Sequence, residues 1–409
     1  MNLANFNKHR NKDYFYGFSQ KRKYFSILQG QLSKKFIISI VGLRRVGKTT
    51  LILQLIDGLI QTGKNRFNIL YYTFDNGGDI EDVISNYQKI SNRDINKDQI
   101  YIFLDEIQKA ADWQNKIKIY YDLYPNIKFI ISGSASLFLN HTESLAGRIT
   151  TNTIKPLFFD EFLEFKKLSY LLDNAEAFED KIILEFEKYL YRQFRDIIDS
   201  DLIEAQSYIK KLKDKIIKED LVNYFDIKHP DLLSKIFDIL CKNPGMLIDY
   251  KNIANDLNFD WRTIQTYTHY LEEAFLIKKI YNYSPNLLTS EKKLKKIYLN
   301  STSFFTGDGN VPGELFENYI IDIYDAKYFW RLNKKEVDII LIKDKKIIPI
   351  EVKYKSQLKK NDFDGLNFFI KKNKLSSGYI ITKGLTQKYD NIKAQSFLSK
   401  FNLDVFNLV

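Results

Sequence analysis

The residues with the clearest chemical potential lie in a glycine-bounded loop near the start of the chain. An apolar run, Phe36–Val41, precedes the loop, and an apolar-periodic segment, Leu51–Ile60, follows it. Strand, loop and helix in this order are the context in which a GxxxxGK[ST] pattern predicts a phosphate-binding loop. The candidate phosphate-binding residues are Gly42, Leu43, Arg44, Arg45, Val46, Gly47, Lys48, Thr49 and Thr50.

Each residue type in this loop suits the binding of a nucleotide. Gly42 and Gly47 permit backbone conformations that a Cβ would obstruct. The loop amides and the free N–H groups of the new helix can then face an anion. Lys48 can reach the β- and γ-phosphates of ATP, and the Thr49 hydroxyl can bind Mg²⁺. A lysine-bearing turn without a ligand is the disfavoured alternative, because strand, loop and helix are all in place.

A pair of acidic residues follows the apolar stretch Ile102–Leu104. A strand there would deliver Asp105 at its carboxyl end, which is where α/β proteins bind their ligands. Asp105 can hold Mg²⁺ through water, while Glu106 can act as a catalytic base on the attacking water. Behind a phosphate-binding loop, this pair predicts ATP hydrolysis and makes Lys48 and Glu106 the catalytic candidates.

Two further residues are candidates for contact with the nucleotide. Ser134 follows the apolar stretch 128–132 and can sense the γ-phosphate, or it belongs to a tight polar turn. Arg148 can act as an arginine finger, in its own chain or from a neighbouring subunit of a homo-oligomer. The alternative for Arg148 is an ordinary surface arginine.

The composition limits the classes of protein to be considered. The 409 residues predict two to four domains, and the formal net charge of +11 favours nucleic acid over a membrane surface as partner. A lysine-rich solvated surface explains the same charge. One cysteine and four scattered histidines exclude a disulfide framework within the chain and argue against a zinc cluster. Because no apolar signal or membrane-spanning stretch is present, we expect a cytoplasmic protein without a membrane partner.

Apolar stretches alternate with helical patterns up to about residue 165. The strand candidates are 36–41, 68–74, 100–104, 128–132 and 149–154. This alternation predicts an α/β fold with a parallel sheet covered on both faces. Residues 1–35 are predicted to form a helix against it.

The middle of the chain is predicted to be helical and then to form a winged helix. Lys210, Lys211, Lys213, Lys215 and Lys218 form either a phosphate-contacting face or, as the favoured alternative, a solvated helix. Farther on, Asp260 caps a candidate recognition helix, 261–275, with candidate strands at 276–283 and 295–300. The side chains that could face a groove are Arg262, Thr263, Gln265, Thr266 and His269. A plain interaction module or a lid is the alternative.

The last hundred residues hold a second group of chemically capable side chains. Two predicted strands, 335–341 and 348–353, are separated by the turn 343–346, so that Asp338 and Glu351 can converge on a divalent cation. Lys353 lies on the same strand face as Glu351 and can assist a nucleophile, and Glu317 on a preceding helix completes the acidic set. Either Mg²⁺ or Mn²⁺ suits such ligands.

Several ordered motifs resemble those of archaeal and bacterial AAA-type ATPases with a C-terminal domain of the PD-(D/E)XK, restriction-endonuclease-like class. The motifs are GLRRVGKTT (42–50), LDEIQKAADWQNKIKIYYD (104–122), ISGSASLFL (131–139), ESLAGR (143–148) and PLFFDEF (156–162). The resemblance implies that Lys48 and Thr49 are Walker A residues, that Asp105 and Glu106 are Walker B residues, and that Ser134 is a sensor. It also implies a nuclease-type role for Glu317, Asp338, Glu351 and Lys353.

The predicted fold class is therefore α/β, with five segments along the chain. These are an N-terminal helical segment (1–35), an AAA-type P-loop NTPase domain with a parallel sheet (36–165), a helical lid or linker (166–228), a winged-helix region (229–305) and a restriction-endonuclease-like α/β domain (306–409). In similar proteins an aspartate usually follows the KIY strand, where this chain has Asn300.

Three hypotheses of function follow from these predictions. The first is a Mg²⁺-dependent ATPase that engages nucleic acid, DNA being favoured, and cleaves it with the C-terminal domain. The second is an ATP-gated switch or scaffold whose nuclease-fold domain binds without cleaving. A DNA-translocating motor ranks last, because no helicase motif beyond the two Walker motifs is visible.

Overall fold

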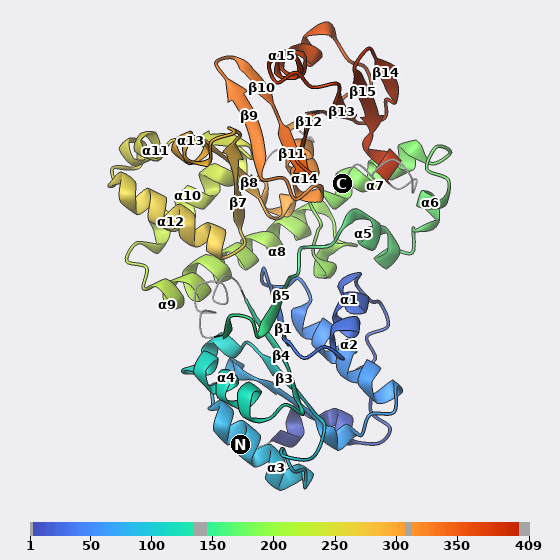
Figure 1. Cartoon of the computed structure of the whole chain (residues 1–409), viewed down its shortest axis with the longest axis vertical. Helices are drawn as coiled ribbons and strands as arrows, with labels where there is room; N and C mark the ends of the chain where they lie inside the picture. Colours follow the sequence, from blue (N-terminus) through green and yellow to red (C-terminus); the bar gives the residue numbers. More distant parts are fainter. Residues whose placement is uncertain (1–2, 135–144, 307–312, 401–409) are drawn as a thin grey trace. The chain divides into compact units, whose positions relative to one another are not determined.

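The computed structural model describes residues 3–134, 145–306 and 313–400. The chain divides into two compact units (Figure 1). The first unit comprises residues 1–157 and 273–275, and the second comprises 158–272 and 276–409. Neither contains a helix long and apolar enough to cross a membrane, within the part of the chain described.

The first unit is built on one five-stranded sheet. Its strands are β1 (Ile37–Gly42), β2 (Ile69–Thr73), β3 (Ile100–Asp105), β4 (Ile127–Ser134) and β5 (Ile149–Thr153). They lie in the order β2-β3-β4-β1-β5, and every neighbouring pair is parallel. Parallel strands have their carboxyl ends at the same edge of a sheet. Gly42 ends β1 and Asp105 ends β3, so both residues lie at this edge, with β4 between their strands. The predicted α/β class with a parallel sheet is confirmed.

Helices cover both faces of this sheet, as expected for strands that are apolar along their whole length. The helix that starts at the phosphate-binding loop is α2 (Lys48–Gln61), and α1 (Tyr24–Gln31) packs on it. The helices α3 (Ile80–Ser91) and α4 (Trp113–Leu123) lie together on the other side (Figure 1). Strands β1 and β3 are buried along their entire length.

The N-terminal segment is less helical than predicted. Apart from two short 3₁₀ turns, Leu3–Asn5 and Lys8–Arg10, only α1 is helical before β1. The extended part covers the edge strand β2, where the Asn7 side chain donates to Tyr71 O (3.0 Å) and accepts from Tyr71 N (2.8 Å). His9 Nε2 lies 3.2 Å from Ile69 O on the same strand. These side chains satisfy backbone groups that an edge strand otherwise exposes.

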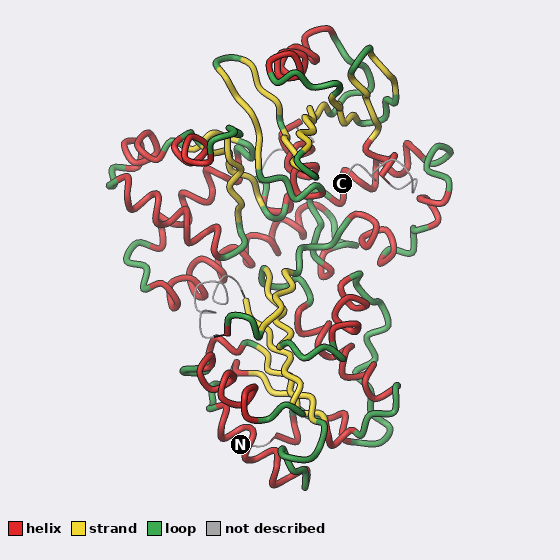
Figure 2. The backbone as a smooth tube through the Cα atoms, in the orientation of Figure 1, coloured by secondary structure: helices red, strands yellow, loops and turns green. Residues whose placement is uncertain are grey.

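The second unit begins with helices and continues with two sheets. Figure 2 shows helices dominating the chain between β5 and β6. The helices in this unit are α5 (Phe159–Phe165), α6 (Tyr170–Asp173), α7 (Glu179–Tyr189), α8 (Leu202–Lys215), α9 (Val222–Phe225), α10 (Pro230–Lys242), α11 (Tyr250–Leu257), α12 (Trp261–Glu273), α13 (Leu287–Lys292), α14 (Gly313–Ile323) and α15 (Asp364–Lys372). A π-helical stretch, Ile216–Leu221, joins α8 to α9.

One sheet of the second unit has the strand order β10-β9-β7-β8-β6. Its strands are β6 (Met246–Ile248), β7 (Ile277–Asn282), β8 (Lys295–Leu299), β9 (Tyr328–Leu332) and β10 (Lys335–Val337). The other sheet has the order β11-β12-β13-β15-β14. It consists of β11 (Ile339–Lys343), β12 (Lys346–Lys353), β13 (Gly378–Thr382), β14 (Gln387–Tyr389) and β15 (Ile392–Ser396).

The single strand predicted for residues 335–341 is in fact two strands. The chain leaves β10, which pairs with β9, and enters β11, which pairs with β12. Asp338 is the one residue between them, at the point where the chain changes sheets. Because Ile339 pairs with Ile350, Asp338 lies beside Glu351. The sequence predicted this proximity, but not the change of sheet.

Candidate functional site

The phosphate-binding loop follows β1 and has a backbone that requires glycine at two positions. Gly42 has φ 146°, and a Cβ on it would lie 2.3 Å from Ile154 O. Gly47 has φ 93°, in the left-handed region that side chains rarely adopt. Arg45 also has a positive φ, 69°. The local sequence therefore produces a tight loop that leads directly into the N-terminus of α2.

Lys48 is the first residue of α2, and its side chain turns back into the loop. Its ammonium group donates to Gly42 O and Leu43 O, both at 3.0 Å. The residue is only 6% exposed. A buried cation held by main-chain carbonyls beside a helix N-terminus fits the binding of an anionic phosphate.

The hydroxyl of Thr49 meets the carboxylate that ends β3. Thr49 Oγ1 donates to Asp105 Oδ2 at 2.6 Å, and Ser132 Oγ of β4 donates to Asp105 Oδ1. Tyr71 OH also donates to Asp105 Oδ2, at 3.4 Å, and burial followed by the Asp105 charge raises the pKa of Tyr71. A hydroxyl and a carboxylate in contact at this edge fit a Mg²⁺ ion bound with nucleotide.

Glu106 comes next in the chain, and its backbone lies in the left-handed region, with φ 51°. Its N–H donates to Asp105 Oδ1 at 3.1 Å. Its carboxylate accepts a hydrogen bond from Gln108 Nε2 at 2.6 Å. The structure thus brings Lys48, Thr49, Asp105 and Glu106 to one edge of the sheet. Gln108 was not predicted as a site residue, and the contact of Ser132 with Asp105 was not predicted either, because only the folded structure reveals these contacts.

The two weaker nucleotide-site candidates have different placements. Ser134 ends β4 and pairs in register with Gly42, so its backbone lies beside the loop; its side chain lies outside the described part of the structure. Arg148 precedes β5, whose first residue pairs with Ile37 at the start of β1. It therefore lies at the opposite edge of the sheet from Gly42. The prediction that Arg148 contacts nucleotide within its own chain is wrong; a role in a neighbouring subunit stays a prediction.

The contacts of Arg148 explain its position. Its Nε and Nη2 atoms donate to the two carboxylate oxygens of Asp122, at 2.8 and 3.0 Å. The Arg148 guanidinium in turn holds the pKa of the Asp122 carboxyl below its usual value. This two-point pair fastens the entry to β5 to the end of α4.

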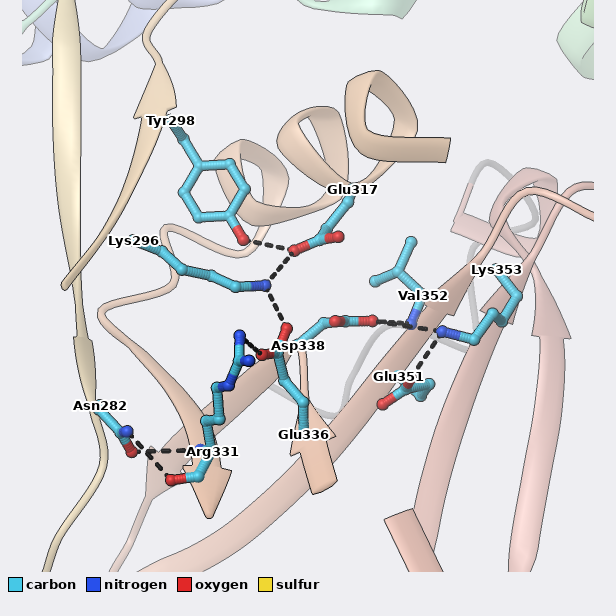
Figure 3. A network of polar contacts seen from close by, with 10 residues as sticks. All are labelled: Asn282, Lys296, Tyr298, Glu317, Arg331, Glu336, Asp338, Glu351, Val352 and Lys353. Atoms are coloured by element: carbon cyan, nitrogen blue, oxygen red, sulfur yellow. Dashed lines mark hydrogen bonds and ion pairs between the residues drawn. The ribbon is translucent and has the colours of Figure 1, made fainter. Parts of the chain in front are cut away.

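The second unit holds the predicted carboxylates in a network with cations (Figure 3). Glu317 of α14 accepts from Lys296 Nζ at 3.0 Å and from the hydroxyl of Tyr298, both on β8. Lys296 Nζ also lies 2.5 Å from Glu336 Oε1 and is 6% exposed. Arg331 completes this half by pairing with the other Glu336 oxygen at 3.3 Å.

The other half of the network contains Asp338, Glu351 and Lys353 (Figure 3). Lys353 Nζ donates to Glu351 Oε1 at 2.6 Å and lies 3.9 Å from Asp338 Oδ2. The same Asp338 oxygen accepts from Val352 N at 2.8 Å. Glu351 Oε2 is buried and has no hydrogen-bond partner among the described residues.

The structure does not assemble the three carboxylates into a metal site. Within the described ranges, no group of three or more His, Cys, Asp or Glu side chains is placed to hold a metal ion. Of the predicted set, Glu317 pairs with Lys296, whereas Asp338 and Glu351 lie next to Lys353. The sequence missed Lys296, because nothing in its local spacing indicates that β8 faces α14.

Burial and charge shift the pKa values of this network. Desolvation and then the Asp338 charge raise the pKa of Glu317 to about 7, against the opposing effect of Lys296. The same two causes raise the pKa of Glu351 well above its usual value. The surrounding carboxylates outweigh desolvation and raise the pKa of Lys296 and of Lys353. Both lysines therefore remain charged, while one or more carboxyls retain a proton near neutral pH.

The helix α12 presents most of the side chains predicted to face a groove. Arg262, Gln265, Thr266 and His269 are exposed, whereas Ile264 and Leu271 on the opposite face are buried. On α8 and the following π-helical stretch, three of the five clustered lysines pair with acids. These pairs are Lys213 with Asp238 (2.8 Å), Lys215 with Glu219 (3.8 Å) and Lys218 with Asp214 (3.3 Å). This pairing favours the solvated-helix alternative for the cluster.

One family model matches the region that contains the phosphate-binding loop. Residues 34–163 match a model described as an AAA domain. This region of the chain is similar to AAA domains. All five strands of the first sheet and the residues Lys48, Thr49, Asp105 and Glu106 lie within it. ATP binding by an AAA-type P-loop ATPase domain is thereby supported.

The rest of the chain matches models without an assigned function. Residues 189–306 match a domain of unknown function, DUF8612, and residues 312–396 match another, DUF4143. An uncharacterized protein of Haemophilus influenzae is 28% identical over 81% of this chain and 86% of its own length. The uncharacterized protein MJ1637 of Methanocaldococcus jannaschii is 28% identical over 69% of this chain and 64% of its own length.

Solved structures with partial similarity include AMPPCP-bound DnaA from Aquifex aeolicus and the Pif1 helicase from Candida albicans. DnaA is 18% identical, with 64% of this chain and 90% of that chain covered and a TM-score of 0.29. Pif1 is 15% identical, with coverages of 38% and 43% and a TM-score of 0.26. TM-scores this low support no functional inference.

Proposed function

We propose that this protein hydrolyses ATP with Mg²⁺ in its AAA domain, and that its second unit engages nucleic acid under control of the nucleotide. The observation that carries the proposal is the 2.6 Å hydrogen bond between Thr49 and Asp105, beside the buried Lys48. No other pair of described residues brings a P-loop hydroxyl against a strand-end carboxylate.

In this proposal each side chain has a separate task. Lys48 neutralises charge on the β- and γ-phosphates, and Thr49 and Asp105 hold the metal. Mg²⁺ supplies further charge neutralisation at the phosphate oxygens when bound. Glu106 takes a proton from the attacking water, and the hydrogen bond from Gln108 orients its carboxylate.

The test is release of phosphate from ATP by the full chain, with a separate measurement of ATP binding. We expect Glu106→Gln to bind ATP normally and to hydrolyse it at least about 100-fold more slowly. Unchanged hydrolysis in Glu106→Gln would overturn its role as the base. Failure of the wild type to bind ATP would overturn the proposed ATPase.

For residues 229–305 we propose a winged helix that binds DNA. The order α10, β6, α11, α12, β7, α13, β8 supports this, with α13 inserted between the two antiparallel wing strands. The exposed polar side chains of α12 and the net charge of +11 support it too. Anisotropy of labelled duplex DNA should show binding that weakens in Arg262→Ala and falls steeply with salt. An RNA duplex of the same sequence tests the preference for DNA. Equal affinity of wild type and Arg262→Ala would argue for an interaction module or lid instead.

For residues 306–409 we propose a nuclease-like fold that recognises nucleic acid without cleaving it. Lys296 pairs with Glu317 and Lys353 pairs with Glu351, so two of the carboxylates that a metal-dependent nuclease would use for its cation already contact a lysine. We therefore favour the ATP-gated switch over the nuclease. Nucleic-acid binding that depends on ATP and persists in Glu351→Ala supports the switch.

Metal-dependent cleavage stays the second candidate, because of one observation. The unpartnered Glu351 Oε2 is a buried carboxylate oxygen that a Mg²⁺ or Mn²⁺ ion would satisfy. In that case Glu351 and Asp338 hold the metal and Lys353 assists the nucleophile. DNA cleavage by the wild type that is lost in Glu351→Ala and in Lys353→Ala would establish this function.

A further inference from the structure

A buried arginine outside every predicted site contacts the phosphate-binding loop. Arg22 precedes α1 and is 7% exposed. Its Nη1 donates to Val46 O of the loop at 2.9 Å and to Lys155 O at 2.7 Å, and its Nη2 donates to Pro156 O at 3.0 Å. Although Arg22 stands between two other basic residues, Lys21 and Lys23, its guanidinium lies inside the first unit.

The residues that Arg22 joins have different roles in the chain. Val46 lies in the loop that would close around the phosphates, next to Gly47. Lys155 and Pro156 follow β5 and lead covalently into the second unit, which starts at residue 158. One guanidinium therefore holds both the loop and the connection through hydrogen bonds to main-chain carbonyls.

Neighbouring contacts fix Arg22 in this position. Its guanidinium carbon lies 5.3 Å from the centre of the Tyr24 ring, and the Tyr24 hydroxyl accepts a hydrogen bond from Lys155 N at 3.2 Å. The segment that leads to Arg22 is tied to α2, because Gln54 Nε2 donates to Phe18 O and Gln20 O at 3.0 and 2.7 Å. Farther back, Tyr16 N and Gly17 N donate to Asp57.

The carbonyl at Val46 depends on the conformation of the loop. Arg45 and Gly47 on either side both have positive φ, so a change in the loop backbone turns the Val46 carbonyl. If that carbonyl moves, the planar guanidinium must move with it or lose a charge-assisted hydrogen bond. The contacts with Lys155 and Pro156 are then disturbed in the same step.

We propose that Arg22 is a positioning residue that couples nucleotide binding at the loop to the connection between the two units. The proposal rests on the proposed ATPase function and adds its route of regulation. In this proposal Arg22 keeps the phosphate-binding loop in the conformation that binds nucleotide. When nucleotide binds, the hydrogen bonds of Arg22 alter the backbone of residues 154–157. Removing the guanidinium should weaken nucleotide binding. It should also abolish the change that nucleotide binding causes in the backbone of residues 154–157.

A matched control exists in the same unit. Arg66 also donates from one guanidinium to three main-chain carbonyls, those of His9, Asn11 and Tyr14, at 2.7, 3.0 and 2.7 Å. These carbonyls belong to the N-terminal segment and not to the loop. Arg22→Met and Arg66→Met therefore each remove a guanidinium that donates to three main-chain carbonyls, and only the first change touches the phosphate-binding loop.

The experiment uses the full chain and measures ATP affinity, kcat and KM, and hydrogen exchange of the amides at 154, 155 and 157 with and without ATP. In the wild type we expect ATP to slow exchange of these amides. Arg22→Met should weaken ATP binding about tenfold or more, because a buried charge-assisted contact is lost, and should remove the exchange response. Arg22→Lys should recover part of both, whereas Arg66→Met should change ATP affinity less than about twofold and keep the response.

The outcomes separate this inference from the proposed function. If the wild type binds and hydrolyses ATP but Arg22→Met behaves like Arg66→Met, the role of Arg22 is overturned while the ATPase stands. An exchange response that persists in Arg22→Met overturns the coupling even if ATP affinity falls. If the wild type binds no ATP, both are overturned.

Discussion

The phosphate-binding loop and the C-terminal carboxylate network differ in how their charges are matched. In the loop, Lys48 donates to neutral main-chain carbonyls, and Asp105 accepts from hydroxyl groups. In the network, each predicted metal ligand lies next to a cation of the protein itself, Lys296 or Lys353. Both regions contain clustered charged residues in the sequence. The contacts described for Lys48 and Asp105 are to neutral groups, whereas those of Glu317 and Glu351 include lysines.

This contrast indicates how a ligand site is distinguished from a structural ion network. A charge that contacts neutral partners gains most when an oppositely charged ligand arrives. A carboxylate already paired with a buried lysine must lose that partner before it binds a metal ion. We infer that the loop is prepared for a ligand and that the network maintains the fold around α14, β8 and β12.

The largest effect is expected from removing the cation that two carboxylates share. Lys296→Met leaves Glu317 and Glu336 without that cation in a buried setting, so we expect a loss of about 3–5 kcal/mol in the free energy of unfolding. Urea unfolding measures it. The control is Lys295→Met on the same strand, which removes a pair with the more exposed Glu291 and should cost about 0–1 kcal/mol. Equal losses in the two variants would contradict a structural role for the network.

Removing Lys48 tests whether the phosphate-binding loop binds a ligand. Lys48→Ala should reduce ATP hydrolysis about 100- to 1,000-fold, because a cation aimed at developing charge is lost. Since Lys48 donates to the main-chain carbonyls of Gly42 and Leu43, we expect the variant to remain folded, and circular dichroism can verify this. Hydrolysis at the wild-type rate would show that the loop is not the nucleotide site.

Glu317 and His9 should contribute to the pH dependence of stability in opposite directions. The folded pKa of Glu317 is raised from 4.5 to about 7, so its contribution to stability is present below pH 4.5 and is lost as pH rises towards 7. The folded pKa of His9 is lowered by burial from 6.5 to about 4, so its contribution is present above pH 6.5 and is lost as pH falls towards 4. Each contribution is at most about 3 kcal/mol.

Unfolding measured between pH 4 and pH 8 checks these two slopes. Glu317→Gln should reduce the loss of stability on raising the pH, with Glu351 contributing in the same direction. His9→Gln should reduce the loss on lowering it. If either variant keeps the slope of the wild type, another group is responsible for it.

The smallest effect is expected at Arg148. Its pair with Asp122 is exposed to solvent, so Arg148→Ala should change the free energy of unfolding far less than Lys296→Met does, as urea unfolding can measure. Because Arg148 lies at the sheet edge opposite the loop, hydrolysis of ATP by the monomer should change less than about twofold. A loss of hydrolysis that depends on protein concentration would instead indicate an arginine finger in a neighbouring subunit.

The sequence predicted the loop and the parallel sheet well, because both depend on local patterns. The residues from Gly42 to Thr49 are contiguous, and the apolar runs of the strands are continuous. Asp105 was predictable because it ends such a run. These features need no knowledge of which distant segments meet.

The missed residues all act across long separations in the chain. Arg22 contacts Pro156, and Ser132 contacts Asp105. Lys296 meets Glu317 only because β8 packs on α14. At the C-terminal site the D…ExK pattern includes Lys353, which contacts Asp338 and Glu351, but it gives no sign of Lys296, which pairs with Glu317 from a distant strand.

The most direct test of this contrast is one assay on the full chain with ATP, DNA and either Mg²⁺ or Mn²⁺. Phosphate release and DNA cleavage are measured together for wild type, Lys48→Ala and Glu351→Ala. We predict ATP hydrolysis that is lost in Lys48→Ala, is retained in Glu351→Ala, and is accompanied by no cleavage. Cleavage by the wild type that disappears in Glu351→Ala, or hydrolysis that survives in Lys48→Ala, would contradict the account.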